Sequence, residues 1–182
     1  MLKDRTIVLA VTGGIAAYKS ATLVRELKRA HAGVFVIMTE HAAEFITPLT
    51  LETLSQNPVA FDLFDETNQW EAEHIVLADR ADLLLVAPAT ANIISKAACG
   101  IADDLVSTAI LTMMAGTPVI MAPAMNNRMW ENPIIAQHVA ALAKLGVTFV
   151  GPAEGVLADG RTGVGRMADE GDIIDAVIRL LT

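Results

Sequence analysis

Cysteine and metal-ligand patterns are scarce in this 182-residue sequence. The single cysteine, Cys99, excludes an internal disulfide framework and a zinc site built on paired cysteines. Cys99 is expected to be a small buried apolar residue, and a reactive thiol is the alternative. No two histidines have the H-x-x-x-H or H-E-x-x-H spacing of a metal site, so the sequence implies no bound metal.

Positive charge is also in short supply. The sequence has 13 Lys and Arg against 21 Asp and Glu, which gives a net charge of -8. A negative protein repels the phosphate backbone of nucleic acids, so nucleic acid is not an expected partner. The sequence has no basic cluster for a membrane surface, and residues 1–5 lack the apolar stretch of a signal peptide. We therefore expect a cytoplasmic protein with no membrane partner.

Aromatic residues are few, at five Phe, two Trp and one Tyr, whereas 53% of the residues are hydrophobic. This aliphatic composition favours helices packed on a sheet over an aromatic-rich β-sandwich. The mean hydropathy of +0.48 is high, yet no run of about 18 apolar residues could span a bilayer. We therefore expect the surplus apolar surface to be covered between subunits or against a flat cofactor.

The order of the predicted elements is that of a parallel α/β sheet in a single domain, 1–182. An aliphatic strand over residues 5–12, a helix over 15–30 and a strand over 34–38 form a βαβ unit. Further strands are predicted at 83–87, 118–121 and 147–150, and further helices at 92–98, 103–114, 133–145 and near the C-terminus. The alternation predicts a Rossmann-like (flavodoxin-like) doubly wound parallel sheet, a three-layer α/β/α fold.

Two helices have clear signals at their ends. Asn132 can cap the helix at 133–145, Pro133 suits its first position, and Gly146 follows its last turn. The C-terminal helix follows the acidic pair Asp169 and Glu170, and its apolar stripe is expected to pack on the sheet. That stripe consists of Ile173, Ile174, Val177 and Leu181.

Ligands of open parallel sheets bind beyond the carboxyl ends of the strands, and a glycine turn lies at the first such end. Gly13 and Gly14 do not match a Walker A loop, because Tyr18 occupies the second required glycine, nor do they match G-x-G-x-x-G. The turn can still offer N–H groups to a single phosphate, which Thr39 at the second strand end could also reach. A plain strand-to-helix turn is equally compatible with these residues.

Two later strand ends carry polar groups among small or soft side chains. Residues 88–92, Pro-Ala-Thr-Ala-Asn, would allow a planar ligand close to the backbone, and Asn92 could also cap a helix. Residues 123–130 place two amides and a guanidinium among methionines, which suggests recognition of a small polar group in an apolar pocket. Asn126 and Asn127 could equally form a turn.

The histidines differ in their surroundings. His31 and His41 fall in segments expected to be exposed and His138 falls within a helix, so a structural role is favoured for each. His74 lies between two glutamates and an aliphatic run, where an imidazole could serve as an acid or base. On composition alone, a structural role is favoured there too.

Four stretches together resemble the homo-oligomeric flavin-containing cysteine decarboxylases. They are residues 12–19, His74 with residues 88–92, residues 123–130 and residues 163–167. The likeness covers essentially the whole chain, and the Pro-Ala-Met-Asn-x-x-Met-Trp stretch is highly specific. The related flavin prenyltransferases share the fold but lack this stretch.

The resemblance implies FMN bound at a subunit interface of a homotrimer or a homododecamer. The implied FMN contacts are Gly13, Gly14, Thr39, Phe45, Pro88, Ala89, Thr90 and Ala91. A fused or separate phosphopantothenate-cysteine ligase is an implied partner.

The resemblance also implies a reaction, the conversion of the thiol 4'-phosphopantothenoylcysteine to 4'-phosphopantetheine in coenzyme A biosynthesis. Flavin-dependent oxidation of the thiol-bearing carbon gives a thioaldehyde, which accepts electrons as the carboxylate leaves and yields an enethiol. His74 matches the family's catalytic base, and Asn126 matches the amide that binds the substrate carboxylate. Further implied substrate contacts are Met129, Ala158 and Gly160.

One residue departs from the pattern. A flap sequence Leu-Ala-Cys-Gly, whose cysteine acts as an acid while the enethiol is reduced, is here residues 157–160, Leu-Ala-Asp-Gly. Asp159 could replace that acid, although an aspartate side chain is ordinarily ionised at pH 7. Two alternatives therefore stand: a peptidyl-cysteine or related thiol decarboxylase that stops at the enethiol, or a flavin-binding regulatory subunit without turnover.

Overall fold

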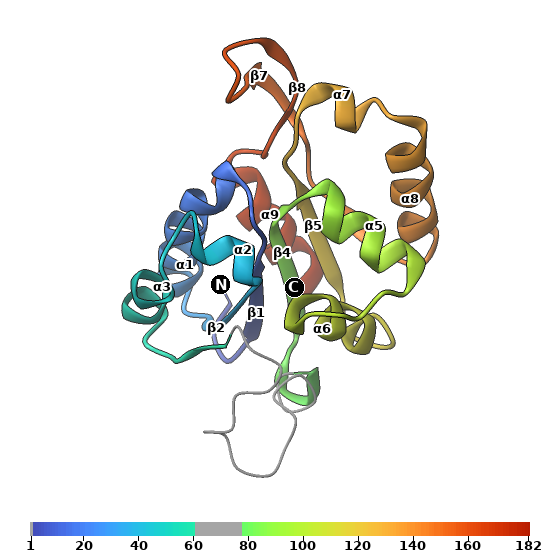
Figure 1. Ribbon diagram of the computed structural model, residues 1–182. Coiled ribbons are helices and arrows are strands. Elements are labelled where there is room, and N and C mark those ends of the chain that lie inside the picture. Colours follow the sequence, from blue (N-terminus) through green and yellow to red (C-terminus); the bar gives the residue numbers. More distant parts are fainter. Residues whose placement is uncertain (1, 61–77) are drawn as a thin grey trace.

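The computed structural model describes residues 2–60 and 78–182, and its centre is a six-stranded parallel sheet (Figure 1). The strands are β1 (Thr6–Val11), β2 (Gly33–Met38), β3 (Val59–Ala60), β4 (Leu83–Ala89), β5 (Val119–Pro123) and β6 (Thr148–Phe149). Their order is β3-β2-β1-β4-β5-β6, so the chain winds outward in both directions from β1 and β4. Without the two-residue β3, the order is that of flavodoxin-like folds. The predicted doubly wound sheet is confirmed.

Helices cover both faces of the sheet (Figure 1). One apolar cluster joins the sheet to α1 (Ser20–Arg29), α3 (Pro48–Ser55) and α9 (Glu170–Leu181). A second cluster joins it to α5 (Ala91–Cys99), α6 (Leu105–Met113) and α8 (Pro133–Lys144). The shorter helices are η1 (Ile15–Lys19), α2 (Glu40–Ala43) and α7 (Asn127–Trp130). These two layers and the sheet confirm the predicted three-layer architecture.

The central strand β1 shows why an unbroken aliphatic run forms a parallel strand. Ile7, Leu9 and Val11 pack in the first cluster, whereas Val8 and Ala10 pack in the second. All five are fully buried, because helices cover both faces and β2 and β4 cover both edges. Burial on both faces therefore removes the polar alternation that marks half-exposed strands.

Several predicted helix ends are confirmed. The Asn132 side chain accepts a hydrogen bond from Ile134 N at 2.9 Å, and Pro133 is the first residue of α8. Gly146 follows that helix with φ of 96°, a conformation that favours glycine. The C-terminal helix packs on the sheet through Ile173 and Val177.

Two structural expectations were wrong, and one element was not predicted. Cys99 is exposed rather than buried, because it is the last residue of α5, where the helix runs out into solvent. Asn92 does not cap α5; Thr90 does, accepting from Ile93 N at 3.4 Å, because the helix begins at Ala91. The sequence also gave no sign of an antiparallel hairpin, β7 (Ala153–Val156) and β8 (Thr162–Arg166), which projects beyond the sheet in Figure 1.

Within residues 2–60 and 78–182, no helix combines the length and apolar character needed to cross a membrane. The same ranges hold no group of three or more His, Cys, Asp or Glu side chains arranged to bind a metal ion.

Asp82 joins the starts of two neighbouring strands, and this contact predicts a pH-dependent stability. Its carboxylate accepts from Thr6 N at 2.8 Å and from Arg5 Nη1 at 2.7 Å. The backbone hydrogen bond from Thr6, aided by Arg5, lowers the pKa of Asp82 despite partial burial. Because the folded-state pKa lies below the unfolded one, the contribution is present above about pH 4 and is lost as pH falls through the folded pKa.

We expect Asp82→Asn to lower the Tm at pH 7 by roughly 2–4 °C, as for a loss of about 1 kcal/mol. Thermal unfolding followed by circular dichroism between pH 3 and 7 measures the difference, which should shrink at the acid end. Asp175→Asn, an exposed carboxylate on α9, is the matched control. A difference from wild type that does not change with pH would contradict this account.

Candidate functional site

A hollow of ≈ 1280 Å³ opens at the carboxyl ends of β1 and β4, the point where the strand order reverses. Small-molecule sites commonly occupy about 300–1,000 Å³, so this one has room for more than one ligand. Predicted site residues that line it are Gly13, Gly14, Thr39, Phe45, Pro88, Thr90, Ala91, Asn126, Met129, Ala158 and Asp159. The structure thus gathers segments that lie far apart in the sequence.

Two predicted site residues, Ala89 and Gly160, do not line the hollow. Ala89 is fully buried in the second apolar cluster and does not line the hollow. Gly160 is exposed in the loop between β7 and β8, beside the hollow rather than in its wall. His74 lies outside the described residues.

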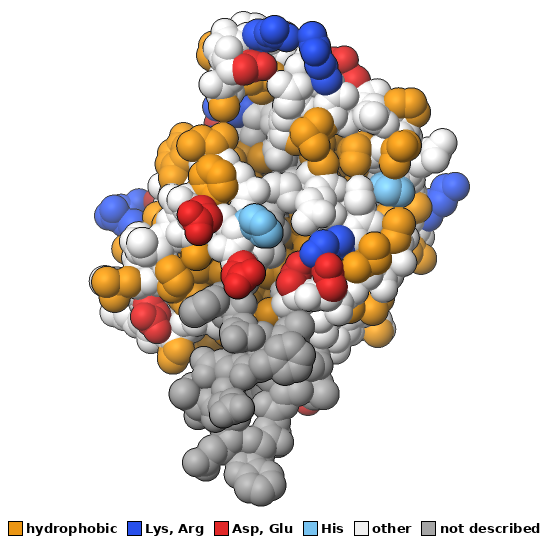
Figure 2. Space-filling view, viewed as in Figure 1, with side chains coloured by type: hydrophobic (Ala, Val, Ile, Leu, Met, Phe, Trp, Pro, Cys, Tyr) orange, Lys and Arg blue, Asp and Glu red, His pale blue; other side chains and the backbone are white. Residues whose placement is uncertain are grey.

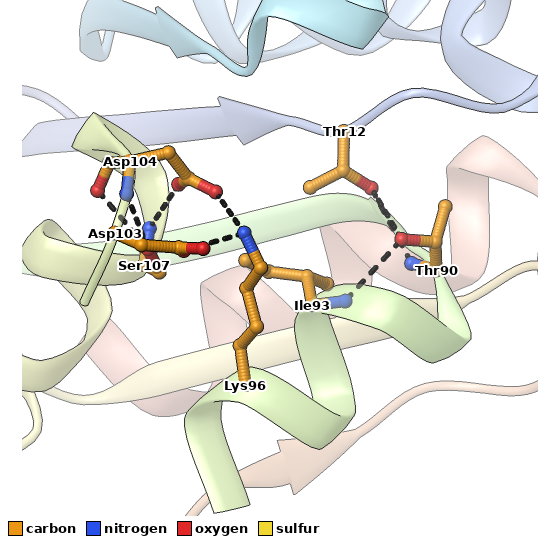
Figure 3. A network of polar contacts seen from close by, with 7 residues as sticks. All are labelled: Thr12, Thr90, Ile93, Lys96, Asp103, Asp104 and Ser107. Carbon is orange, nitrogen blue, oxygen red and sulfur yellow. Dashed lines mark hydrogen bonds and ion pairs between the residues drawn. The ribbon is translucent and has the colours of Figure 1, made fainter. Parts of the chain in front are cut away.

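Hydroxyl groups tie the two central strand ends together. Thr12 Oγ1 donates to the Pro88 carbonyl at 2.7 Å, and Thr90 N donates to Thr12 Oγ1 at 3.3 Å (Figure 3). The Ser20 hydroxyl donates to the Ala87 carbonyl at 2.9 Å, which fixes the start of α1 against β4. These contacts hold the glycine turn and the 88–92 segment in a fixed relation at the base of the hollow.

Gly13 permits a close approach of two elements. A Cβ placed there would lie 2.5 Å from His41 Cβ and 2.8 Å from the His41 carbonyl carbon. Any larger residue would push α2 away from the loop after β1. The same approach brings His41 into the wall of the hollow, although its side chain is exposed as predicted.

Thr39 lies directly after β2, and the surroundings of its hydroxyl show whether the lining of the hollow fits a flavin. Its Oγ1 is buried and has no hydrogen-bond partner among the described residues, yet the residue lines the hollow. A buried hydroxyl without a partner costs about 1–3 kcal/mol, a cost that a polar ligand group in the hollow would remove. Phe45, 47% exposed, supplies an aromatic surface at the same wall. A hydroxyl beside an aromatic ring suits the polar and flat parts of a flavin.

Lys96 forms a charged cluster in another part of the wall. Its Nζ lies 2.6 Å from Asp103 Oδ1 and 2.6 Å from Asp104 Oδ2 (Figure 3). Burial disfavours the charged lysine, but the two carboxylates outweigh it and raise the pKa of Lys96. The hydrogen bond from Lys96 in turn lowers the pKa of Asp103. Lys96 and Asp103 therefore stay charged around neutral pH.

Asn126 and Asp159 meet across the mouth of the hollow. Asn126 Nδ2 donates to Asp159 Oδ2 at 3.0 Å, although the residues are 33 positions apart. Asn126 Oδ1 accepts from Arg128 N at 2.9 Å, which caps α7 and fixes which side of the amide faces Asp159. Asp159 Oδ1 accepts from Arg161 N at 3.0 Å. The predicted carboxylate-binding amide is thus hydrogen-bonded to the residue that replaces the flap cysteine.

Glycines seat the hairpin on the loop after β5. Met125 N donates to the Gly165 carbonyl at 2.9 Å. A Cβ on Gly165 would overlap the Met125 carbonyl oxygen at 2.2 Å, and one on Gly163 would lie 3.2 Å from Asn127 Cβ. The backbone of β8 therefore lies directly against the Asn126 segment, and this contact places residues 157–159 in the wall of the hollow.

Large apolar side chains gather at the mouth. Ile15, Tyr18, Phe45, Met129 and Val156 all line the hollow and are between 47% and 69% exposed. On the face drawn in Figure 2, hydrophobic side chains are interspersed with acidic and histidine side chains. The surplus apolar surface expected from composition is therefore partly concentrated around this site.

Sequence reasoning missed several wall residues. His41, Lys96, Asp103, Asp104 and Arg166 line the hollow but were not proposed. Asp104 and Ser107 form a capping box at α6, a spacing visible in the sequence that could have marked this position. Arg166 lies in the 163–167 stretch that carries the resemblance, but its contact with Gly155 is not visible in the sequence. His41 had no local signal, because its place depends on the close approach to Gly13.

Comparison with known proteins places the chain in a family. The family model described as Flavoprotein matches residues 1–182. The chain belongs to the Flavoprotein family. This membership confirms the resemblance to flavin-containing cysteine decarboxylases and makes a flavin the expected class of cofactor.

Relatives within the Flavoprotein family differ in length. The chain is 46% identical over 174 residues to the coenzyme A biosynthesis bifunctional protein CoaBC of Bacillus subtilis, covering 96% of this chain and 42% of that protein. It is 43% identical to a probable phosphopantothenoylcysteine decarboxylase of Streptococcus mutans, covering 95% of this chain and 97% of that one. A PPC decarboxylase variant complexed with pantothenoylaminoethenethiol matches with a TM-score of 0.85 and 32% identity over 97% of each chain. The chain thus spans less than half of the bifunctional relative.

The close contact between Gly165 and the Met125 carbonyl predicts how fast this member of the Flavoprotein family is cleaved in limited proteolysis. We expect Gly165→Ala to loosen the hairpin, because the added methyl group would overlap the Met125 carbonyl oxygen. Trypsin cleavage after Arg161, monitored by mass spectrometry, should become at least several-fold faster. Gly171→Ala is the matched control, since a Cβ there meets nothing within 4 Å. Equal cleavage rates in the two variants would show that the hairpin does not depend on this contact.

Proposed function

We propose that this chain binds FMN and decarboxylates 4'-phosphopantothenoylcysteine to 4'-phosphopantetheine, a carboxy-lyase step of coenzyme A biosynthesis. One observation carries the proposal: a single hollow is lined both by Thr39, whose buried hydroxyl has no partner among the described residues, and by Asn126, whose amide is held in one orientation. The 43% identity to a probable phosphopantothenoylcysteine decarboxylase over nearly its whole length supports the substrate.

The residues divide into a cofactor side and a substrate side. Thr39, Thr90 and the glycine turn would hold the FMN, with Phe45 against its ring. Bound FMN would supply a two-electron oxidation of the thiol-bearing carbon. Asn126 would hold the substrate carboxylate through its Nδ2, because Oδ1 is engaged by Arg128 N. His74 is proposed as the base from the resemblance alone.

The assembly is also a proposal. The five exposed apolar residues at the mouth would be covered by a neighbouring subunit in a homotrimer or a homododecamer, since apolar surface gathered around a site favours such contacts. We propose a single flavoprotein domain in the cytoplasm. The 42% coverage of the bifunctional relative supports a fused or separate phosphopantothenate-cysteine ligase as partner.

A second candidate reaction ends at the enethiol. Both carboxylate oxygens of Asp159 accept hydrogen bonds, Oδ2 from Asn126 and Oδ1 from Arg161 N. A carboxylate whose two oxygens both accept hydrogen bonds is not arranged to donate a proton to the substrate. This arrangement favours a decarboxylase, acting on this substrate or on a peptidyl-cysteine, that lacks the reductive step.

Replacing Thr39 by the nearly isosteric valine tests the cofactor site. We expect Thr39→Val to leave the apoprotein as stable or more stable, because it removes a buried hydroxyl that has no partner in the part of the chain that the structure describes. The same change should weaken FMN binding by about tenfold, as for the loss of one hydrogen bond worth about 1.4 kcal/mol.

Flavin fluorescence titration and thermal unfolding of the apoprotein measure the two effects. Thr112→Val, on the outer side of α6, is the matched control and should not change FMN affinity. Loss of both stability and affinity would instead identify Thr39 as a structural residue.

The fate of the product tests the reaction. We expect wild type to release carbon dioxide from 4'-phosphopantothenoylcysteine and His74→Asn to release none. Asp159→Cys should raise the yield of 4'-phosphopantetheine relative to the product two hydrogens lighter, because a thiol can donate the proton that a doubly hydrogen-bonded carboxylate does not. Mass spectrometry distinguishes the two products.

Each remaining outcome has a defined meaning. A wild-type protein that yields only 4'-phosphopantetheine, unchanged in Asp159→Cys, would reject the second candidate. An FMN-loaded protein that releases no carbon dioxide from this substrate or from a peptide with a C-terminal cysteine would reject catalysis and leave a flavin-binding regulatory subunit.

A further inference from the structure

The hydrogen bond between Asn126 and Asp159 has the chemistry of the substrate contact that Asn126 is proposed to make. The amide donates its Nδ2 hydrogen to a carboxylate oxygen at 3.0 Å, and that carboxylate belongs to the chain itself. We propose that Asp159 is a specificity-determining residue whose side chain occupies the carboxylate position at Asn126, so that a substrate carboxylate must displace it. This inference rests on the proposed function.

The orientation of the amide makes the contact selective. Rotating the Asn126 amide by half a turn would place Oδ1 against the Asp159 carboxylate and Nδ2 against Arg128 N. Both new pairs would be mismatched, acceptor against acceptor and donor against donor. The amide therefore presents only N–H toward the hollow, and Asp159 and an incoming carboxylate compete for the same donor group.

The loop that carries Asp159 is built to be displaced. Ala158, Asp159, Gly160 and Arg161 are all exposed. The turn is closed by short-range contacts, Leu157 N to the Arg161 carbonyl at 2.7 Å and Gly160 N to the Leu157 carbonyl at 2.9 Å. Gly160 has φ of 80°, and a Cβ there would meet nothing within 4 Å. Asp159 can therefore leave Asn126 without disturbing packed side chains or the seat of β8.

Charge adds to the competition. A substrate carboxylate at Asn126 would bring a second negative charge next to Asp159, and like charges at hydrogen-bonding distance repel. Loss of carbon dioxide removes that charge, and Asp159 can then return to the amide. Asp159 thus opposes binding of the substrate, which carries the carboxylate, but does not oppose formation of the product, which carries no carboxylate.

Two ligands that differ only in the carboxylate test the proposal on the FMN-loaded protein. One is the hydroxyl analogue of the substrate, with serine in place of cysteine, which lacks the thiol needed for oxidation. The other is the same compound without its carboxylate. Isothermal titration calorimetry gives both affinities, and their ratio isolates the carboxylate, because the phosphate and the rest of the ligand are common to both.

We expect Asp159→Ala to bind the carboxylate ligand about three- to tenfold more tightly, within the range for the net contribution of one typical hydrogen bond, because Asp159 is exposed. The affinity for the ligand without the carboxylate should not change. Asp159→Asn, which removes the charge but keeps an acceptor for Asn126, should lie between wild type and Asp159→Ala. Glu154→Gln removes a negative charge from the same hairpin and should leave the ratio at the wild-type value.

Other outcomes overturn the proposal in distinguishable ways. Unchanged affinities for both ligands in Asp159→Ala, or a selective loss of affinity for the carboxylate ligand, would show that Asp159 does not compete for Asn126. An equal change in both affinities, which leaves their ratio at the wild-type value, would also overturn the competition and would assign Asp159 a general role in flap structure. Failure of both ligands to bind wild type would overturn the proposed substrate class, and this inference with it.

Discussion

The hydrogen bond from Thr12 Oγ1 to the Pro88 carbonyl joins the ends of β1 and β4, the two strands between which the strand order reverses. Every functional segment is placed relative to that junction. The glycine turn follows Thr12, α5 begins just after Thr90, and the loop after β5 is held to β4 by the bond from Ala124 N to the Ala89 carbonyl at 3.0 Å. Parallel strands end at one edge of the sheet, so fixing this pair fixes the floor on which the other loops converge.

The two sides of the hollow are held with different firmness. On the side proposed for the cofactor, the Thr12 hydroxyl holds Thr90, a close backbone approach places Gly13, and a hydrogen bond from Thr39 N to the Val11 carbonyl at 3.0 Å places Thr39. On the side proposed for the substrate, the backbone of β8 packs closely at Gly165, but the loop that carries Asp159 is exposed. Firmly held strand ends beside an exposed loop suit a site that retains one ligand while another binds and is released.

The sequence was sufficient for the sheet and insufficient for the contacts between distant loops. β1, β2, β4 and β5 are buried on both faces, and burial of that kind leaves unbroken aliphatic runs that periodicity detects. The ends of α8 were predictable because Asn132, Pro133 and Gly146 act through local backbone chemistry.

The remaining features depend on tertiary contacts. The glycine-rich β7–β8 hairpin has little alternation, and its position depends on Met125, which is 40 residues from Gly165. Burial of Cys99 was the wrong expectation, because the residue's exposure depends on where α5 ends. Asn126 and Asp159 were both proposed as site residues, but no local pattern shows that they are hydrogen-bonded to each other.

The Thr39 hydroxyl is buried and has no hydrogen-bond partner among residues 2–60 and 78–182, so it would couple the proposed FMN binding to the stability of the fold. A ligand group that accepts from or donates to this hydroxyl would remove the free-energy cost of a buried polar group without a partner, in addition to the contacts it adds. A ligand present at a hundred times its Kd stabilises the fold by about 2.7 kcal/mol, which lowers the unfolded fraction available to proteases about a hundredfold. Under the proposed function, FMN binding would therefore slow degradation of this chain through the unfolded state.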